Sequence, residues 1–289
     1  MKLWVRALWK HRIAYLFISP FFIIYGVFMG FPAVFSFYLS FTAWNGNPHQ
    51  PMQWVGLANY RELFSDPIFF TAVKMMALYV PLAVCLGTAG ALLLAILLNS
   101  ELRLRGLFRL TFFLPTLTSG VVAAIVFRQL FSLFFPGLTW TAAFIPALLS
   151  IVVMTLWVSV GYNAILYLAG LQGIPSALYE AAELDGASAW QKFRYITLPG
   201  LRPTTFFIVT MGIIYGLQAF EPMQLLTRGG PENQTVSFVL YLYDNAFRYF
   251  RWGYASALAY SLFFIIIVFT ALYFFISGRF GRSLTQEQP

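Results

Sequence analysis

The sequence predicts an all-α integral membrane protein with six transmembrane helices, and composition is the first observation behind this prediction. Hydrophobic residues make up 60% of the 289 residues, aromatic residues 19% and charged residues only 10%. An ordinary soluble domain carries about 25% charged residues. No soluble fold of this length has enough interior for so much apolar surface, because the fraction of surface that a chain can bury is limited by its size.

Uncharged stretches predict where the helices lie. A bilayer core of about 30 Å requires roughly 20 apolar residues in a helix, and stretches of this length recur along the chain. The longest, from Gln129 to Tyr179, contains the turn signal FFPGLTW (134–140), which separates two helices. A porin-like barrel would instead show segments of about 10 residues with alternating polarity. The predicted spans lie near residues 14–41, 70–98, 107–133, 142–170, 204–226 and 254–277, in a single transmembrane domain over residues 1–289.

Lysine and arginine residues in the short loops predict the orientation. With six spans, twelve of the 18 basic residues lie on the side of the N-terminus and four on the other side. Such an excess marks the cytoplasmic side, so both termini and the loop 171–203 are expected in the cytoplasm. The net charge of +8 follows from this bias. It does not indicate nucleic-acid binding, because the basic residues are scattered over several loops.

Motifs for nucleotide binding, hydrolysis and metal binding are missing from the sequence. The nearest approach to a phosphate-binding loop, DGASAWQK (185–192), lacks the second glycine and the hydroxyl residue after Lys192. Cys85, His11 and His49 are far apart in sequence and form no ligand cluster. We therefore expect no catalytic residue, no metal and no cofactor in this chain.

The segment Leu178–Pro203 is unusually polar for the middle of such a chain. It carries three acids and three bases between two apolar runs. Connections between bundle helices usually have about 2–8 residues, whereas residues 171–203 make a far longer one. Glu180-Ala-Ala favours a helix, and Gly186 can adopt the positive φ of a tight bend. We expect a helix, a bend and a second helix at about 187–196 that together bind a partner; a solvated loop is the alternative.

This segment resembles the EAA signature of permease subunits of binding-protein-dependent ABC importers. Glu180-Ala-Ala, three residues, Gly186, nine residues and Ile196-x-Leu198-Pro199 match its spacing without a departure. The longer stretch LAGLQGIPSALYEAAELDGASAWQKFRYITLPGLRP resembles the carbohydrate-uptake branch, which includes the maltose and glycerol-phosphate permeases. The resemblance extends over residues 12–280 through VGLANYRELFSDPIFFTAVKM, RGLFRLTFFLP and LLTRGGPENQT.

The resemblance implies a type I ABC importer permease fold with a cytoplasmic coupling helix between helices 4 and 5, seated in a groove of a separate ATPase. It implies that Glu180, Ala181, Ala182 and Gly186 contact the ATPase, and that Ile196, Leu198 and Pro199 anchor the segment to the fifth helix. ATP and Mg would bind to the partner ATPase. The implied partners are two copies of that ATPase, a second related permease subunit, an extracytoplasmic solute-binding protein and a carbohydrate. The implied location is the plasma membrane of a bacterium or archaeon.

Family precedent places the substrate path between the permease subunits, along helices four to six. The candidate residues offer aromatic faces, amides and a carboxylate, which suit sugars: Trp157, Tyr162, Asn163, Tyr215, Gln218 and Glu221. A purely structural role is the alternative for each, since aromatic belts and interhelical hydrogen bonds are common in membrane helices. The Glu221 carboxylate would repel an anion, which favours a neutral sugar over a sugar phosphate.

A gradient-driven secondary transporter of a small polar solute is the alternative function. Proteins of that class use interrupted helices around sites near the membrane midplane, and proton-coupled ones use acids within the membrane. Glu221 is the only acid of this sequence near the interior of a predicted span, and six helices are few for that class. An import permease is therefore the favoured interpretation.

Overall fold

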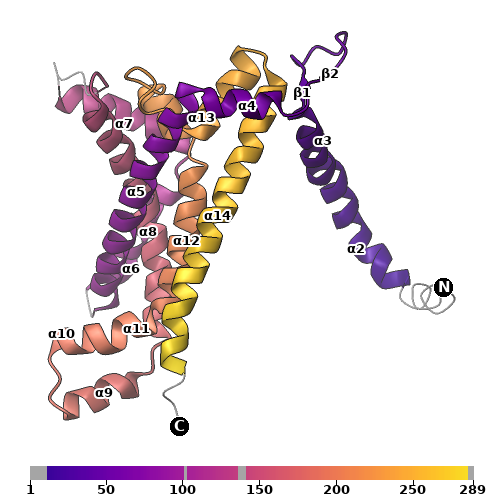
Figure 1. Ribbon diagram of the computed structural model, residues 1–289. Coiled ribbons are helices and arrows are strands. Elements are labelled where there is room, and N and C mark those ends of the chain that lie inside the picture. The colour runs from indigo at the N-terminus through magenta and orange to yellow at the C-terminus, as the bar shows by residue number, and fades with distance from the viewer. Residues whose placement is uncertain (1–11, 101–102, 136–140, 286–289) are drawn as a thin grey trace. The chain divides into compact units, whose positions relative to one another are not determined.

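The structure, a computed structural model, describes residues 12–100, 103–135 and 141–285. Helices dominate this part of the chain (Figure 1). The turn predicted at 134–140 lies largely outside it. The chain divides into two compact units: Met1–Ser65 with Leu242–Tyr260, and Asp66–Tyr241 with Ser261–Pro289.

The first unit contains one long apolar helical segment. It consists of α2 (Arg12–Tyr25), the π-helix η1 (Gly26–Gly30) and α3 (Phe31–Leu39), which together form 28 residues with the hydropathy of a membrane span. The segment coincides with the span predicted near 14–41.

A short structured loop follows this segment. Strands β1 (Thr42–Ala43) and β2 (Gln53–Trp54) pair antiparallel, with Thr42 opposite Trp54, and α4 (Ala58–Ser65) comes next. The buried Asn59 amide donates to two backbone carbonyls just before and within β1, at 2.8 and 2.9 Å. These bonds satisfy carbonyls that would otherwise be buried without a partner.

A segment of short helices precedes the last helix. It contains α13 (Phe238–Tyr243) and the π-helix η5 (Asp244–Arg248), and α14 (Trp252–Thr285) follows. Within the first unit, the Arg251 guanidinium donates to both carboxylate oxygens of Glu62, at 2.6 Å each. Both bonds come from the same nitrogen, Nη2, and charge-assisted bonds of this kind are stronger than neutral ones.

The second unit is built on α5 (Pro67–Asn99) and α8 (Phe144–Gln172), which pack along one another and against α12 (Arg202–Leu217). Small side chains permit the close approach: Ala91, Ala95 and Ala164 are fully buried in the core between these helices. Membrane helices associate through such small residues because lipid provides no hydrophobic drive to bring them together.

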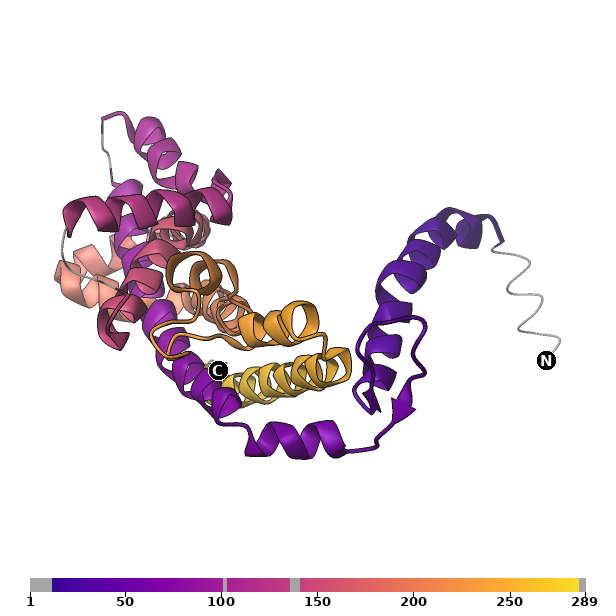
Figure 2. The same cartoon turned by 90° about the horizontal axis from the view of Figure 1, so that it is seen from above.

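The span predicted near 107–133 is broken. It consists of α6 (Arg105–Phe113), the 3-10 turn η2 (Leu114–Leu117) and α7 (Gly120–Phe134), and the helical direction changes by 99° at the break. From above, α6 and α7, in magenta, run at a steep angle to one another (Figure 2). Pro115, just after α6, cannot donate a helical hydrogen bond, which weakens the helix at this point.

The span predicted near 204–226 is also interrupted. Its first part is α12, which ends at Leu217, and the π-helix η4 (Met223–Thr227) begins after a non-helical stretch at 218–220. Pro222 has no N–H with which to continue the helix across this stretch.

Four described helices are long and apolar enough to cross a membrane: Arg12–Leu39, Pro67–Asn99, Phe144–Gln172 and Trp252–Phe275. The number rises to six when each of two bent pairs is counted as one span. These pairs are Arg105–Leu117 with Gly120–Phe134, and Ala189–Gly200 with Arg202–Leu217. The chain is therefore an all-helical membrane protein, as the sequence predicts.

Candidate functional site

The predicted partner-binding segment forms a pair of short helices, named here the coupling element (Ser176–Gly200). α9 (Ser176–Leu184) is followed by α10 (Ala189–Lys192), the π-helix η3 (Phe193–Thr197) and α11 (Leu198–Gly200). Figure 1 shows α9 and α10 projecting beyond the ends of α8 and α12. The helix, bend and helix expected from the sequence are all present, although the second helix begins at 189 and continues to 200.

The bend between the two helices depends on Gly186. Its φ is +76°, in the left-handed region that favours glycine. A Cβ added at this position would meet nothing within 4 Å. The backbone conformation, and not a lack of space, is therefore what requires glycine here.

Three sets of contacts hold the coupling element in shape. Ser188 and Gln191 form a capping box at the start of α10, with bonds of 2.7 and 3.3 Å. The Lys192 ammonium donates to the Glu183 carboxylate at 2.5 Å, which joins α10 to α9 across the bend. At the other end, the hydroxyls of Tyr179 and Thr197 are 2.9 Å apart and hydrogen-bonded. The two helices are thus tied together at both ends.

The ion pair of Glu183 and Lys192 fixes geometry more than it adds stability. The hydrogen bond from Lys192, and then its positive charge, hold the pKa of the Glu183 carboxyl below its ordinary value. A lowered pKa contributes stability above the ordinary glutamate pKa, and this contribution disappears as the pH falls through the lowered value. The pair is therefore intact at neutral pH. Because the Glu183 side chain is largely exposed, solvent screens its energetic contribution.

The outer surface of the coupling element is accessible. Glu180 and Ala181 are exposed and Ala182 is half-buried. Two large apolar side chains project beside them: Leu184 is 91% exposed and Trp190 is 68% exposed.

The end of the coupling element packs where α8 stops and α12 starts. Ile196, Leu198 and Pro199 are half-buried there, and two of them, Ile196 and Pro199, help to line a hollow of about 490 Å³. A Cβ on Gly200 would lie 2.7 Å from Cδ1 of Ile174, so glycine permits the close approach. The residues expected to anchor the element therefore lie directly before α12, in α11 and η3.

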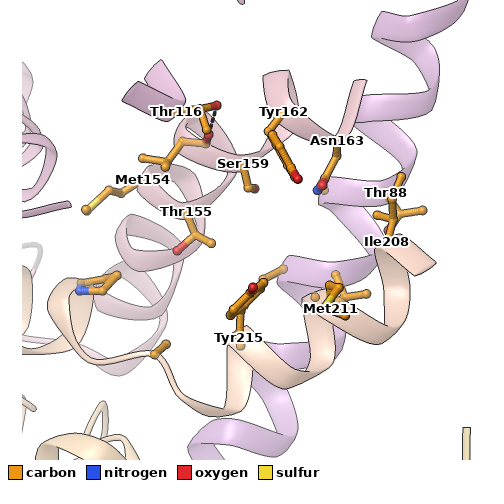
Figure 3. Close-up of a pocket in the computed structure, with 18 of the residues that line it drawn as sticks. Thr88, Thr116, Met154, Thr155, Ser159, Tyr162, Asn163, Ile208, Met211 and Tyr215 are labelled. Atoms are coloured by element: carbon orange, nitrogen blue, oxygen red, sulfur yellow. Dashed lines mark hydrogen bonds between the residues drawn. The ribbon is translucent and has the colours of Figure 1, made fainter. Parts of the chain in front are cut away.

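A cavity of about 540 Å³ lies between α5, α8 and α12 (Figure 3). Four of the six predicted path residues line it: Tyr162 and Asn163 from α8, Tyr215 from α12, and Glu221 from the segment after α12. Figure 3 shows Tyr162 and Asn163 across the cavity from Tyr215. The structure therefore brings together residues from three separate segments.

The other two predicted path residues do not line this cavity. Trp157 packs edge-on against Phe127, with ring centroids 5.4 Å apart. Gln218 is the C-cap residue of α12 and is exposed. Both belong to helices that form the cavity wall, but their side chains are not part of the lining.

Several lining hydroxyls are absent from the sequence prediction. Thr155 and Ser159 line the cavity from α8, two turns and one turn before Tyr162 respectively, and Thr116 lines it from η2. The spacing of four and then three residues places the three α8 side chains on one helix face, and this pattern could have identified them. Thr116 donates to the Val158 carbonyl at 3.0 Å.

The cavity contains one charged side chain. Glu221 lines it, and none of its described lining residues is Lys, Arg or His. A Cβ on Gly120 would lie 2.2 Å from Oε2 of Glu221, so the carboxylate rests against the first residue of α7. In the part of the chain that the structure describes, no group of three or more His, Cys, Asp or Glu side chains could hold a metal ion.

Comparisons with known proteins agree with this architecture. Residues 87–286 match the family model described as binding-protein-dependent transport system inner membrane component. The chain is 35% identical to a probable ABC transporter permease protein, YesP, of Bacillus subtilis, over 98% of this chain and 96% of that protein. It is also 35% identical to the arabinooligosaccharides transport system permease protein AraP of Bacillus subtilis, over 94% of this chain and 90% of that protein.

The fold is similar to that in a crystal structure of a bacterial ABC transporter involved in the import of the acidic polysaccharide alginate. The TM-score is 0.82, over 96% of this chain and 99% of that chain. At 23% sequence identity this likeness supports the fold alone.

Proposed function

Since the chain belongs to the family of binding-protein-dependent transport system inner membrane components, we propose that it forms half of the import path for a neutral mono- or oligosaccharide. As a permease of this family, the chain is a multi-pass inner-membrane transport subunit and not an enzyme, and a separate ATPase hydrolyses ATP. The family assignment also decides against a gradient-driven secondary transporter.

The cavity between α5, α8 and α12 supports the proposal that the substrate is a sugar. Its lining offers the aromatic faces of Tyr162 and Tyr215, the Asn163 amide and several hydroxyls. Apolar walls with a few convergent polar groups are typical of small-molecule sites, and a volume of about 540 Å³ lies within the range of roughly 300–1,000 Å³ for such sites. A relative with the name of an arabinooligosaccharide permease points to the same substrate class.

The charge of the cavity favours a neutral substrate. Glu221 is the charged group of the lining, and no basic side chain lies among the described residues beside it. Glu221 is exposed, so water screens part of its charge, but like charges a few ångströms apart still repel. An acidic saccharide would therefore be disfavoured in this cavity.

The coupling element supports the proposal that this chain receives the movement of a separate ATPase. Glu180, Ala181, Ala182 and Gly186 would contact a cytoplasmic ATPase, while Ile196, Leu198 and Pro199 would transmit its movement to α12. The accessible outer surface and the ties across the bend support this role, because a segment that transmits movement must hold its shape. Both termini then lie in the cytoplasm. A second related permease, a second ATPase copy and an external solute-binding protein complete the complex.

Uptake by the assembled transporter tests the proposed substrate. We expect a neutral pentose trisaccharide to be taken up about tenfold faster than a uronic-acid trisaccharide, since repulsion between like charges about 4 Å apart at a protein surface amounts to roughly 1–4 kcal/mol. Tyr215→Ala should raise the KM for the neutral saccharide by about tenfold through loss of a stacking face. Tyr215→Phe, which retains the ring, is the matched control.

Preferential uptake of the uronic-acid trisaccharide would contradict the proposed substrate class. Equal KM values for Tyr215→Ala and the unmodified transporter would contradict the placement of the path through this cavity.

A further inference from the structure

A buried hydrogen bond joins α8 to α12 beside the coupling element. The hydroxyl of Tyr167, near the end of α8, donates to the hydroxyl of Thr205, in the first turn of α12, at 3.0 Å. The two residues are 38 positions apart in sequence, and the whole coupling element lies between them. The bond therefore closes the base of a long helical hairpin.

The surroundings of this bond are apolar. Tyr167 is fully buried in the core that Ala91, Ala95 and Ala164 form with Leu and Ile side chains. Because solvent does not reach Tyr167, a hydroxyl that loses its partner here stays buried without one, which is costly. The bond adds a directional tie between α8 and α12 that apolar packing does not supply.

Contacts between the two limbs of the hairpin recur in antiparallel order from the tip of the coupling element to Tyr167. The hydroxyls of Tyr179 and Thr197 are 2.9 Å apart. Closer to the base, a Cβ on Gly170 would lie 2.6 Å from Oγ1 of Thr204, so glycine brings the limbs together. The paired positions, in order from the tip, are 179 with 197, 174 with 200, 170 with 204, and 167 with 205.

The paired limbs end where the cavity begins. Leu166, directly before Tyr167, lines the cavity, and so does Ile208, one turn after Thr205. The bond between Tyr167 and Thr205 is thus the last of these contacts before the cavity. It lies between the part of the chain proposed to bind the ATPase and the part proposed to hold the saccharide.

We propose that the end of α8, the coupling element and the start of α12 move as one rigid lever, and that Tyr167 and Thr205 are the positioning pair that closes it beside the cavity. The path then opens by movement of this lever against other helices, and α8 and α12 do not separate at this end. The inference rests on the proposed function, since it takes the coupling element as the contact with the ATPase.

A disulfide across the base of the lever tests this proposal. A Cβ on Gly170 would lie 3.4 Å from Cβ of Thr204, near the roughly 3.5–4.5 Å between the Cβ atoms of a disulfide. With Cys85 replaced by serine, Gly170→Cys combined with Thr204→Cys should form this bond on oxidation of the assembled transporter. We expect equal saccharide uptake in the oxidised and reduced forms, because the lever does not open at its base.

The reduced form of the same variant is the matched control for the disulfide. Loss of uptake on oxidation that a reductant restores would overturn the rigid lever. Failure of the disulfide to form in folded protein would contradict the close approach of α8 and α12 on which the lever depends.

Removal of the hydroxyls tests the positioning pair. We expect Tyr167→Phe and Thr205→Val each to lower the saccharide taken up per ATP hydrolysed about threefold, the size of one interhelical hydrogen bond in a membrane protein. A lever whose base opens more often transmits less of the movement. The double variant should be no worse than either single variant, because both substitutions remove the same bond.

Two further variants separate the bond from general effects on α12. Thr205→Ser keeps a hydroxyl and should keep the ratio of uptake to ATP hydrolysis. Thr210→Val is the matched control, since the Thr210 hydroxyl donates to the Phe206 carbonyl within α12, at 2.7 Å, and ties no second helix. We expect its ratio to equal that of the unmodified transporter.

An unchanged ratio in Tyr167→Phe and Thr205→Val would overturn the positioning role, as would independent effects of the two substitutions in the double variant. If the unmodified transporter takes up no saccharide, the proposed function fails. The same cycle in the apparent unfolding temperature of the purified complexes then still decides on the pair, and it also serves if the cysteine variant does not fold.

Discussion

Substitution of Gly186 by proline is expected to abolish binding-protein-stimulated ATP hydrolysis and uptake while the permease remains folded in the membrane. Gly186 has a φ of +76°, whereas proline fixes φ near −65°. The N–H of Gly186 also donates to the Glu183 carbonyl at 3.0 Å, a bond that proline cannot make. Both changes displace α10 from α9, so the surface offered to the ATPase is lost. The measurement is ATPase activity of the reconstituted complex with and without binding protein.

A matched substitution separates this conformational effect from a simple loss of glycine. Asparagine tolerates the left-handed region better than most residues, and a Cβ at position 186 meets nothing within 4 Å. Gly186→Asn should therefore keep at least about half of the stimulated activity, since its conformational cost is of order 1 kcal/mol or less. Full stimulation in the proline variant would contradict a coupling role for the bend.

Substitution of Gly161 by alanine is expected to prevent correct folding of the second unit. A Cβ on Gly161 would lie 1.7 Å from the carbonyl oxygen and 2.6 Å from the carbonyl carbon of Phe112. These are backbone atoms of α6, so no side chain can rotate away, and the two helices must separate. Overpacking in a well-packed interior costs about 1–3 kcal/mol, sometimes more. Gly161 directly precedes Tyr162 and Asn163, so the cavity wall would move as well.

The yield of folded protein in the membrane and its unfolding temperature measure this effect. Gly106→Ala, on α6, is the matched control, because it adds the same methyl group without a collision. We expect a marked loss of folded protein for Gly161→Ala and none for Gly106→Ala. Equal yields and equal unfolding temperatures for the two variants would show that α6 and α8 do not approach as closely as described.

The sequence predicted the helical elements well where local signals decide them. Long uncharged stretches locate α5 and α8, and the positive φ of Gly186 was expected from its place between two helical patterns. The 99° break before α7 was not predicted. Hydropathy does not reveal the break, because the residues on both sides of it are apolar. Pro115 alone does not fix the angle of a bend.

The cavity was predicted in part because its walls come from distant segments. Tyr162, Asn163, Tyr215 and Glu221 stood out as polar or aromatic groups within apolar helices, and the structure brings them together. The same criterion selected Trp157, whose ring packs against Phe127 instead. A side chain's direction depends on tertiary packing, which composition does not reveal. The contact of Gly120 with Glu221 joins segments far apart in sequence and is visible only in the fold.

The most direct test of the central claim, that the coupling element binds the ATPase, is a cysteine crosslink at Ala182. Native Cys85 is first replaced by serine, and cysteine is placed at Ala182 or, as a control, at the exposed Ser100. Each variant is then tested against cysteines in the groove of the co-expressed ATPase. We expect a crosslink from position 182, with an extent that changes on addition of ATP, and none from position 100. Absence of a crosslink at 182, with uptake preserved after disruption of the bend at Gly186, would contradict the coupling role of Ser176–Gly200.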